Sequence, residues 1–411
     1  MADKNQEVMD KVISLCKRRG FVFQGSEIYG GLAGTWDYGP LGVALKNNIK
    51  NLWWNKFVEN REDMFGVDAA IIMNPKVWEA SGHVSGFVDP TEDGKQFNVM
   101  FKTAVGAGEE AIDSYLRPET AQGMFVNFKN VVDAFHPKLP FGLAQIGKAF
   151  RNEISPRDFI FRVREFEQME IEYFVQEKDW KDFFENWREQ MFDWMKEIGL
   201  PKSSIHELEV PDGDRAHYSK RTIDFEFDFP FGRKELYGLA YRTDFDLKNH
   251  SDSSGVALEY FDEESGERFS PHVIEPTFGV DRTVLAILSS AYTEDELGGE
   301  KRNYLKLSKN IAPIKAAVFP LLKNKPELVE KAREIYMMLK KDIPQIVFDD
   351  NGNIGKRYRR QDEIGTPVCI TVDFDTLGEK PELADTVTVR DRDTGEQKRV
   401  AIKDLIKEIS T

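Results

Sequence analysis

A long hairpin is the feature that most constrains the fold of this chain. Two strand-like runs flank a short turn in FGLAQIGKAFRNEISPRDFIFRVREFEQMEIEYF, residues 141–174. Pro156 and Asp158 are turn-forming residues, whereas the flanking runs are rich in apolar and aromatic side chains. The segment therefore predicts two adjacent antiparallel strands.

The second run of this hairpin should carry an acidic face and an apolar face. Successive residues of a strand point to opposite sides of a sheet. One face therefore carries Phe166, Gln168, Glu170 and Glu172, and the opposite face carries Met169, Ile171 and Tyr173. Arg151 and Glu153 are expected to point to a common side near the end of the first strand. Spacing alone leaves two alternatives open, a binding site and a solvated face with cross-strand ion pairs.

The remaining pattern predicts an α+β fold in residues 1–305 and a smaller α/β domain in residues 311–411. Strand-like runs at 222–229 and 235–242 favour a mostly antiparallel sheet with helices around it. The tail alternates short strands with an amphipathic helix over 326–341; the strands are expected at 314–322, 345–350, 367–373 and 385–391. A helix over 279–297 and a linker over 298–313, rich in glycine and charge, are expected between the two domains.

Composition excludes several classes of protein. No apolar run approaches the roughly 18 residues that span a bilayer, and the N-terminal segment reads as an amphipathic helix without the features of a signal peptide. We therefore expect a cytoplasmic protein with no membrane role. Cys16 and Cys369 are the two cysteines, and the six histidines lack metal-ligand spacing, so no zinc is expected. The net charge of −15 falls entirely on residues 1–310, which makes the tail less acidic than the body.

Two further segments place charged residues at the starts of helices. In PHVIEPTFGVDRTVLAIL, Arg282 falls in the first turn of a helix, where the helix dipole disfavours a cation. A bound phosphate would account for this position, and the alternative is an arginine that reaches water or pairs with Asp281 or Glu275. In YLRPETAQGMFVNF, Glu119 precedes a helix that opens at Thr120. It is either a capping carboxylate or a ligand-binding one.

Taken together, these segments resemble the three signature motifs of class II aminoacyl-tRNA synthetases, and specifically those of the homodimeric class IIa glycyl-tRNA synthetases. Motif 1 is similar to ALKNNIKNLWWNKFVENREDMFGVDAAIIMNP, motif 2 to FRNE with FRVREFEQME, and motif 3 to EPTFGVDR. Other matching segments are, in order, GTWDYGPLG, WEASGH, LRPETAQG, KLPFGLAQIGKAFRNE, REFEQMEIEYF, AHYSK and RTDFDL. The resemblance covers nearly the whole chain. It implies a six- or seven-stranded antiparallel catalytic sheet, a dimer interface at motif 1 and a C-terminal anticodon-binding domain.

The resemblance implies that the chain joins glycine to AMP with ATP as substrate, and then to the 3′ end of tRNA(Gly). Arg151 would hold the α-phosphate and Arg282 the γ-phosphate, which makes these two arginines the catalytic residues, while Phe166 would stack on adenine. Glu153 and Glu235 would bind Mg²⁺ or the adenine side of the nucleotide. The full set implied for ATP is Arg151, Asn152, Glu153, Phe161, Arg162, Val163, Arg164, Glu165, Phe166, Glu235, Leu236, Gly279, Val280, Asp281 and Arg282.

Glycine offers an ammonium, a carboxylate and no side chain, so a selective pocket needs acidic groups and no spare room. By resemblance, Glu119, Glu170 and Glu275 are the carboxylates of the glycine site. The full set implied for glycine is Arg61, Glu119, Phe166, Glu167, Gln168, Met169, Glu170, Glu275, Pro276, Thr277, Phe278 and Gly279. Most relatives have serine where this chain has Thr277, which keeps the hydroxyl and adds a methyl group.

The tail resembles the anticodon-binding domain of the glycyl, threonyl, prolyl and histidyl enzymes, most clearly in GNIGKRYRRQDEIGTPVCITVD. Lys356, Arg357, Arg359 and Arg360 bracket Tyr358, which favours phosphate contacts and base stacking, with a solvated charge run as the alternative. The rival function is a catalytically inactive relative that only binds nucleic acid. The presence of both motif arginines and of the glycine-site acids favours the enzyme.

Overall fold

The computed structural model describes residues 2–91, 93–216 and 218–410, and the chain divides by its internal contacts into two units. The larger unit comprises Gln24–Asp37 and Lys50–Ala286, and the smaller comprises Met1–Phe23, Tyr38–Ile49 and Ile287–Thr411. The N-terminal helix therefore groups with the C-terminal part of the chain, whereas the sequence suggested residues 1–305 as one domain. His217 of the AHYSK segment lies outside the described residues.

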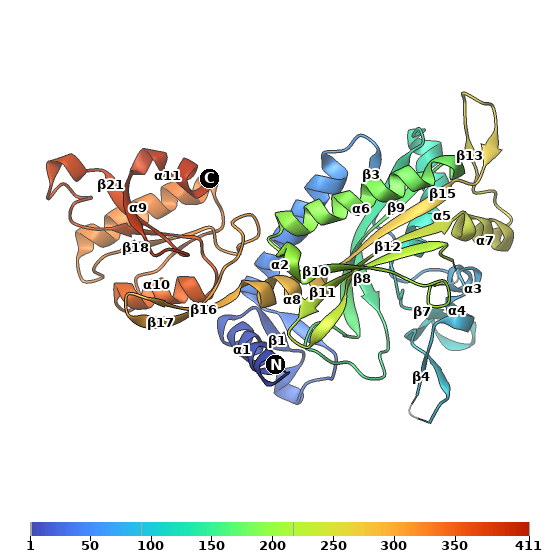
Figure 1. Cartoon of the computed structure of the whole chain (residues 1–411), viewed down its shortest axis with the longest axis horizontal. Helices are drawn as coiled ribbons and strands as arrows, with labels where there is room; N and C mark the ends of the chain where they lie inside the picture. The colour runs from blue at the N-terminus through green and yellow to red at the C-terminus, as the bar shows by residue number, and fades with distance from the viewer. Residues whose placement is uncertain (1, 92, 217, 411) are drawn as a thin grey trace. The chain divides into compact units, whose positions relative to one another are not determined.

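A seven-stranded sheet forms the centre of the larger unit (Figure 1). Its order is β10 (Ile205–Glu209), β11 (Arg221–Phe229), β12 (Gly232–Thr243), β15 (His272–Gly279), β9 (Glu165–Val175), β8 (Phe141–Phe150) and β3 (Met64–Gly66). Neighbouring strands pair antiparallel except β3 and β8, which are parallel. The predicted antiparallel sheet is therefore confirmed, with one parallel edge strand.

Strands β8 and β9 form the predicted hairpin, but they are shorter than the sequence indicated. The connecting loop runs over residues 151–164, so it is longer than the ISPRD turn alone. Its two ends are joined because the N–H of Arg151 donates to the carbonyl oxygen of Arg164 at 2.9 Å. Arg151 and Glu153 therefore lie in this loop, directly after the end of the first strand.

The two faces of the sheet bury different side chains. Helix α6 (Trp180–Glu197) packs along one face against β12 and β15 (Figure 1). Helices α5 (Ala121–Phe135) and α7 (Phe245–Ser254) bury an apolar cluster against the opposite face. On β9, Tyr173 contacts Trp187 of α6, and the next residue, Phe174, contacts Phe128 of α5. The predicted alternation along this strand is confirmed, and it assigns Glu170 and Glu172 to the α5 face.

Short elements complete the larger unit. They are β4 (Val88–Pro90) with β5 (Gln96–Asn98), β6 (Lys102–Val105) with β7 (Ile112–Tyr115), β13 (Tyr260–Phe261) with β14 (Arg268–Phe269), α3 (Lys76–Ala80) and α4 (His83–Gly86). Residues of both units occur in β1 (Val22–Gln24), β2 (Trp36–Tyr38), α2 (Pro40–Trp54) and α8 (Val280–Ala291). Over the described ranges, no helix has the length and apolar character needed to cross a membrane.

The smaller unit contains a five-stranded sheet. Its order is β19 (Ile346–Phe348), β18 (Ala316–Pro320), β20 (Val368–Val372), β21 (Thr386–Asp391) and β22 (Gln397–Ala401). Its helices include α1 (Ala2–Arg19), α9 (Pro326–Asp342), α10 (Ile354–Glu363) and α11 (Leu405–Ser410). The strands and the helix predicted in the tail are confirmed. Residues 316–409 bury an apolar core of their own.

The segment expected to end a helix and form a linker is a hairpin instead. Helix α8 ends at Ala291, and β16 (Tyr292–Leu297) pairs with β17 (Glu300–Leu305). Gly298 and Gly299 form the two-residue turn, with positive φ angles of 62° and 79°. Tight hairpin turns require positive φ at both central positions, which glycine adopts without strain. The Gly-Gly pair between two short runs was therefore a hairpin signal.

Candidate functional site

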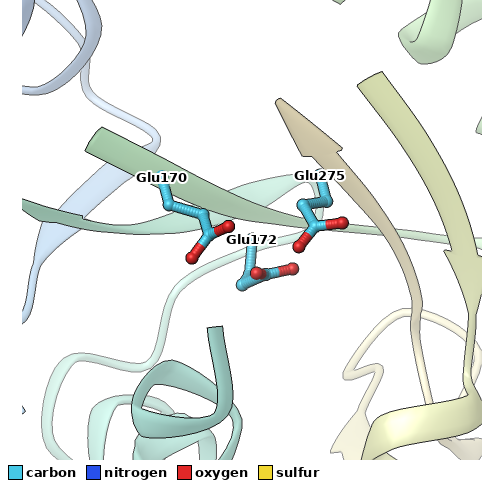
Figure 2. Close-up of side chains that lie close together, drawn as sticks. All are labelled: Glu170, Glu172 and Glu275. Atoms are coloured by element: carbon cyan, nitrogen blue, oxygen red, sulfur yellow. The ribbon is translucent and has the colours of Figure 1, made fainter. Parts of the chain in front are cut away.

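The acidic face of β9 is buried within the larger unit. Glu170 and Glu172 are 2% and 0% exposed, and Glu275 of the neighbouring strand β15 is 6% exposed. One carboxylate oxygen of each residue lies within 4.8 Å of the others. Figure 2 shows the three side chains converging, with Glu172 between the other two. Burial excludes the alternative of a solvated face.

Two threonine hydroxyls hold the carboxylate of Glu170. Thr277 Oγ1 donates to Glu170 Oε1 at 3.0 Å, and Thr120 Oγ1 donates to Glu170 Oε2. Thr277 lies on β15 and Thr120 immediately precedes α5, so the hydroxyls approach from two different elements. Both oxygens of Glu170 are thereby fixed in orientation.

Glu119 belongs to the same cluster and is bound by side chains. Its Oε1 accepts a hydrogen bond from Gln122 Nε2 at 3.0 Å, and its Oε2 lies 3.3 Å from His83 Nε2. Burial acts to raise the pKa of Glu119, but the attraction of His83 and then Arg242 outweighs it and holds the pKa well below its usual range. Glu119 is therefore an ionised carboxylate whose partners are the side chains of Gln122 and His83. These contacts favour a ligand-binding role over the alternative that Glu119 caps the helix.

Arg242 of β12 supplies positive charge inside the cluster. It is 1% exposed, and its NH1 donates to Glu275 Oε1 at 2.9 Å. Its Nε and NH2 donate to the two carboxylate oxygens of Asp246 at 2.8 Å each. The guanidinium also lies 3.7 Å from the ring centroid of Tyr218. Arg242 was not among the residues predicted for the site, although its spacing of four residues from Asp246 was an available signal.

Five buried carboxyl groups surround this guanidinium: Glu119, Glu170, Glu172, Asp246 and Glu275. Burial, followed by Glu119, raises the pKa of Glu170. Burial also raises the pKa of Glu275 to about 8, against the opposing attraction of Arg242. The pKa of Glu172 is raised well above its usual range, first by burial and then by Glu275. Because the cluster holds more acidic than basic groups, a cationic ligand would be stabilised there.

A cavity of about 280 Å³ opens onto this cluster. Glu119, Glu170 and Glu275 line it beside the small residues Gly238 and Ala240. A second cavity, of about 150 Å³, adjoins it. Both cavities are lined by Arg151, Gln168, Glu235, Gly238 and Thr277. We call them the acidic cavity and the arginine-lined cavity.

Arg151 lies where the two cavities adjoin. Its guanidinium is 5.2 Å from the ring centroid of Phe166 and 5.2 Å from that of Phe87. Its Nε donates to the carbonyl oxygen of Pro118 at 3.1 Å. These contacts hold the guanidinium between two aromatic rings, at a position that a phosphate group can reach from the cavity.

Arg282 lines the arginine-lined cavity from the first turn of α8, as predicted. Its NH1 donates to Glu235 Oε2 at 2.9 Å, and its guanidinium lies 4.5 Å from the ring centroid of Phe161. The partner of Arg282 is therefore Glu235, in place of the Asp281 or Glu275 considered from the sequence. An arginine at a helix N-terminus beside a cavity is well placed for an anion.

Glu153 and Glu235 line the arginine-lined cavity, and their chemistry fits a magnesium ion. Arg162 Nε donates to Glu153 Oε2 at 2.6 Å, and Arg282 NH1 donates to Glu235 Oε2. These contacts use one oxygen of each carboxylate. Magnesium is usually held by one or two carboxylates together with phosphate oxygens and water.

Most of the residues predicted for ATP line the arginine-lined cavity. They are Arg151, Glu153, Phe161, Arg162, Val163, Phe166, Glu235, Leu236, Gly279, Asp281 and Arg282. Asn152, Arg164, Glu165 and Val280 do not line it. The side chain of Glu165 is exposed and pairs with Lys148, and Val280 is fully buried. The side chains of Glu165 and Val280 therefore lie outside the cavity, and the assignment of these two residues to the nucleotide stays a prediction.

The residues predicted for glycine divide between the two faces of the sheet. Glu119, Gln168, Glu170, Glu275 and Thr277 line the acidic cavity, and Phe166, Glu167 and Gly279 line the adjoining one. Arg61, Met169, Pro276 and Phe278 line neither. Phe278 packs on Trp194 of α6, while Arg61 pairs with Asp63 and lies over Trp187. These contacts place Arg61 and Phe278 on the α6 face, and strand alternation directs Met169 and Pro276 to the same face. The assignment of these four residues to the glycine site stays a prediction.

The basic run of the tail is largely occupied within the chain. Arg357 is 1% exposed, and its NH2 donates to the carbonyl oxygens of Asp350 and Gly352 at 3.1 and 2.8 Å. Arg360 pairs with Asp349 at 2.7 Å. The expectation that Arg357 contacts phosphate is therefore wrong, whereas Lys356 is exposed.

Comparison with known proteins agrees with this architecture. Residues 101–291 match the family described as the tRNA synthetase class II core domain (G, H, P, S and T). Residues 315–411 match the family described as the anticodon binding domain. Together with the antiparallel sheet and its buried acidic cluster, these matches define a class II aminoacyl-tRNA synthetase.

Full-length relatives give the finer assignment. The chain is 46% identical to the glycine–tRNA ligase of Clostridium tetani, over 98% of both chains. It is 46% identical to that of Caldanaerobacter subterraneus and 45% identical to that of Thermus thermophilus, over 97% of each pair of chains. The chain belongs to the glycine–tRNA ligase family.

Proposed function

We propose that this chain activates glycine and transfers it to tRNA(Gly) in two steps. In the first step, an oxygen of the glycine carboxylate attacks the α-phosphorus of ATP, and the bond to pyrophosphate breaks to give glycyl-adenylate. In the second step, a hydroxyl of the 3′-terminal ribose of the tRNA attacks the carbonyl carbon, and AMP leaves. The observation that carries the proposal is an acidic cavity adjoining one lined by three arginines, Arg151, Arg162 and Arg282.

The acidic cavity would hold the ammonium group of glycine. Glu119, Glu170 and Glu275 offer carboxylates there, and the cluster has fewer basic than acidic groups. A site selective for glycine would close its lining against the α-carbon, so that a methyl group at that carbon would meet atoms already in place. Glycine is then the substrate that gains the charge contacts without a steric penalty.

The arginine-lined cavity would hold the triphosphate. Arg151 would face the α-phosphate, where negative charge increases in the transition state, and Arg282 would hold the γ-phosphate. Arginine suits both positions because it stays charged and binds phosphate oxygens in pairs. Phe166 would contact adenine. Glu153 and Glu235 would hold Mg²⁺, which would neutralise phosphate charge.

Exchange of pyrophosphate into ATP, measured with each of the twenty amino acids in turn, tests this function. Exchange with glycine alone is the expected result. A folded protein that binds ATP but exchanges with another amino acid would overturn the assignment of substrate. A folded protein that exchanges with none and binds no ATP would favour the inactive nucleic-acid-binding relative.

We also propose that the chain works as a homodimer in the cytoplasm, where its tRNA partner is found. The motif 1 resemblance supports the dimer, and so do Ile71 and Ile72 of that segment, which are 36% and 50% exposed. Exposed apolar side chains close together are typical of contact surfaces. Sedimentation equilibrium at micromolar concentration should give a dimer, and a monomer would contradict this part of the proposal.

Thr277→Val is expected to lower kcat/KM for glycine by about tenfold, because Glu170 Oε1 loses its donor at 3.0 Å inside a buried site and retains only the longer contact from Gln168 Nε2 at 3.4 Å. Valine keeps the shape of threonine and removes only the hydroxyl. Thr277→Ser is the matched control, since it keeps the hydroxyl, and it should stay close to the wild type. Pyrophosphate exchange at varied glycine concentration measures both. Equal losses of kcat/KM in the two variants would indicate that the shape of the side chain at position 277, and not its hydrogen bond to Glu170, determines the activity.

Removal of the tail after Ala312 is expected to preserve glycyl-adenylate formation and to abolish charging of tRNA. Among the described residues, those that line the two cavities all precede position 283, and residues 316–409 have their own apolar core. Pyrophosphate exchange and tRNA charging, measured on the same folded preparation, give the two readouts. Loss of both activities would show that the tail is needed for the first step as well.

A further inference from the structure

Glu172 is a buried carboxyl group without a hydrogen-bond partner. It is 0% exposed, and neither of its carboxylate oxygens has a partner in the described part of the chain. An unpaired carboxylate in such a place is strongly disfavoured relative to a protonated or partnered one. The proposed reaction gives Glu172 no role, although it lies in the acidic cluster (Figure 2).

The strand register brings Glu172 opposite Glu275. In the register of β9 and β15, Tyr173 pairs with Ile274 and Glu170 pairs with Thr277, which places Glu172 opposite Glu275 between these two pairs. Between these pairs the ladder is interrupted, since Pro276 has no N–H to donate. Like charges directly opposite on neighbouring strands are destabilising. Two ionised carboxylates are therefore disfavoured at this position. One proton, bound to either Glu172 or Glu275, would remove the repulsion between the two negative charges.

The other acids near Glu172 already have hydrogen-bond donors. Glu170 accepts from two threonine hydroxyls, and Glu275 accepts from Arg242. The charged groups that act on Glu172 are Glu170 on its own strand, Glu275 on β15, Arg242 on β12 and Asp246 on α7. On the other side, β8 presents Leu143 at the register position opposite Glu172. A proton is therefore best placed on Glu172, because this carboxyl group of the cluster accepts no hydrogen bond from the described residues.

We propose that Glu172 is a positioning residue that stays protonated in the working enzyme and donates a hydrogen bond to the carboxylate of Glu275. The two carboxyl groups are within 4.8 Å, so a small side-chain rotation brings them into contact. The proton removes one negative charge and orients Glu275 toward the ammonium of glycine. This inference rests on the proposed glycine site. The raised pKa of Glu172, caused by burial and by Glu275, agrees with it.

Infrared spectroscopy tests the proton directly. The C=O stretch of a protonated carboxylic acid should persist at about pH 9, since carboxyl groups ordinarily ionise near pH 4. That pH also lies above the pKa of about 8 for Glu275. The band should disappear in Glu172→Gln and remain in Glu275→Gln. A band that is absent from the wild type, or that survives in Glu172→Gln, would overturn the proposal.

Kinetics test the positioning role. Glu172→Gln keeps a neutral donor of the same size, so kcat/KM for glycine should stay within about threefold of the wild type. Glu172→Leu removes the donor and should raise KM for glycine about tenfold, with kcat and KM for ATP unchanged. Equal losses in both variants would overturn the neutral-donor role. If Glu172→Leu does not fold, the glutamine variant and the infrared band decide.

Failure of the underlying glycine site can be recognised separately. If glycine binds elsewhere, Glu275→Gln leaves KM for glycine unchanged, and the positioning role is overturned. The infrared band of Glu172 does not depend on where glycine binds, so it reports on the proton in either case.

Discussion

Glu275→Gln is expected to lower kcat/KM for glycine by at least a factor of about 100 while KM for ATP is unchanged. Glu275 is buried and bonded to Arg242, so its charge is not screened by water. Loss of one partner from a buried charge pair costs about 3 kcal/mol, which corresponds to the hundredfold effect. Pyrophosphate exchange with glycine and ATP varied separately provides the measurement.

The same residue should set the pH dependence of glycine binding. The pKa of Glu275 is raised to about 8, chiefly by burial, and an ammonium group binds the ionised form better. Below that pH, glycine must displace a proton, so kcat/KM for glycine should rise with pH up to about 8. It should fall again where the amino group of free glycine loses its proton. Glu275→Gln should lack the rising limb.

Glu259→Gln is a suitable control, because Glu259 is an exposed acid that lines neither cavity. This substitution removes one carboxylate charge, as Glu275→Gln does, and it should leave kcat/KM for glycine and KM for ATP unchanged. An unchanged KM for glycine in Glu275→Gln would contradict the assignment of Glu275 to the ammonium. A rise in KM for ATP alone would instead indicate that Glu275 contacts the nucleotide.

The alternation along β9 could be read from the sequence, but the burial of its acidic face could not. A solvated face and a buried site have the same spacing of Glu170 and Glu172, and the difference lies in what covers them. Here α5, the preceding Thr120 and Arg242 provide that cover from distant parts of the chain. Resemblance to known motifs supplied the function, whereas the residues alone left both alternatives open.

Other features required contacts that local pattern does not encode. Arg61 and Phe278 belong to matching segments, yet their side chains lie on the α6 face. Strand alternation along β15 turns Phe278 away from the acidic cavity, and Arg61 lies before β3, where it contacts Trp187 of α6. Arg242 belongs to the matching segment RTDFDL, but it was not among the residues predicted for the site, because an arginine within a strand pattern is ordinarily exposed. The turn at Gly298 and Gly299 is the contrasting case, since a Gly-Gly pair between two short runs is a local signal for a hairpin.

Arg242→Gln is expected to lower the free energy of unfolding of the larger unit by about 3–5 kcal/mol, because several buried carboxylates lose their counter-charge. Arg242 contacts both Asp246 and Glu275 and is 1% exposed. Urea unfolding followed by tryptophan fluorescence is the measurement. All seven tryptophans lie between positions 36 and 194, so the signal reports on the larger unit.

Arg188→Gln provides the matched control on the surface of the same unit. Arg188 pairs with Glu185 and Glu207, and its side chain is 36% exposed. Exposed pairs of this kind contribute about 0–1 kcal/mol, so this variant should unfold at nearly the urea concentration of the wild type. Equal destabilisation by the two substitutions would show that the buried cluster does not depend on Arg242 for its stability.

The loss of stability in Arg242→Gln should be partly reversed by acid. Without the guanidinium, the pKa values of Glu172 and Glu275 in the folded state, already raised by burial, move further above the value of about 4.3 for an unfolded chain. The folded state then binds more protons than the unfolded state, so stability falls as pH rises above that value and recovers as pH is lowered. Unfolding of the variant at about pH 6 and pH 8 compares the two conditions, and greater stability at the higher pH would contradict the origin assigned to the effect.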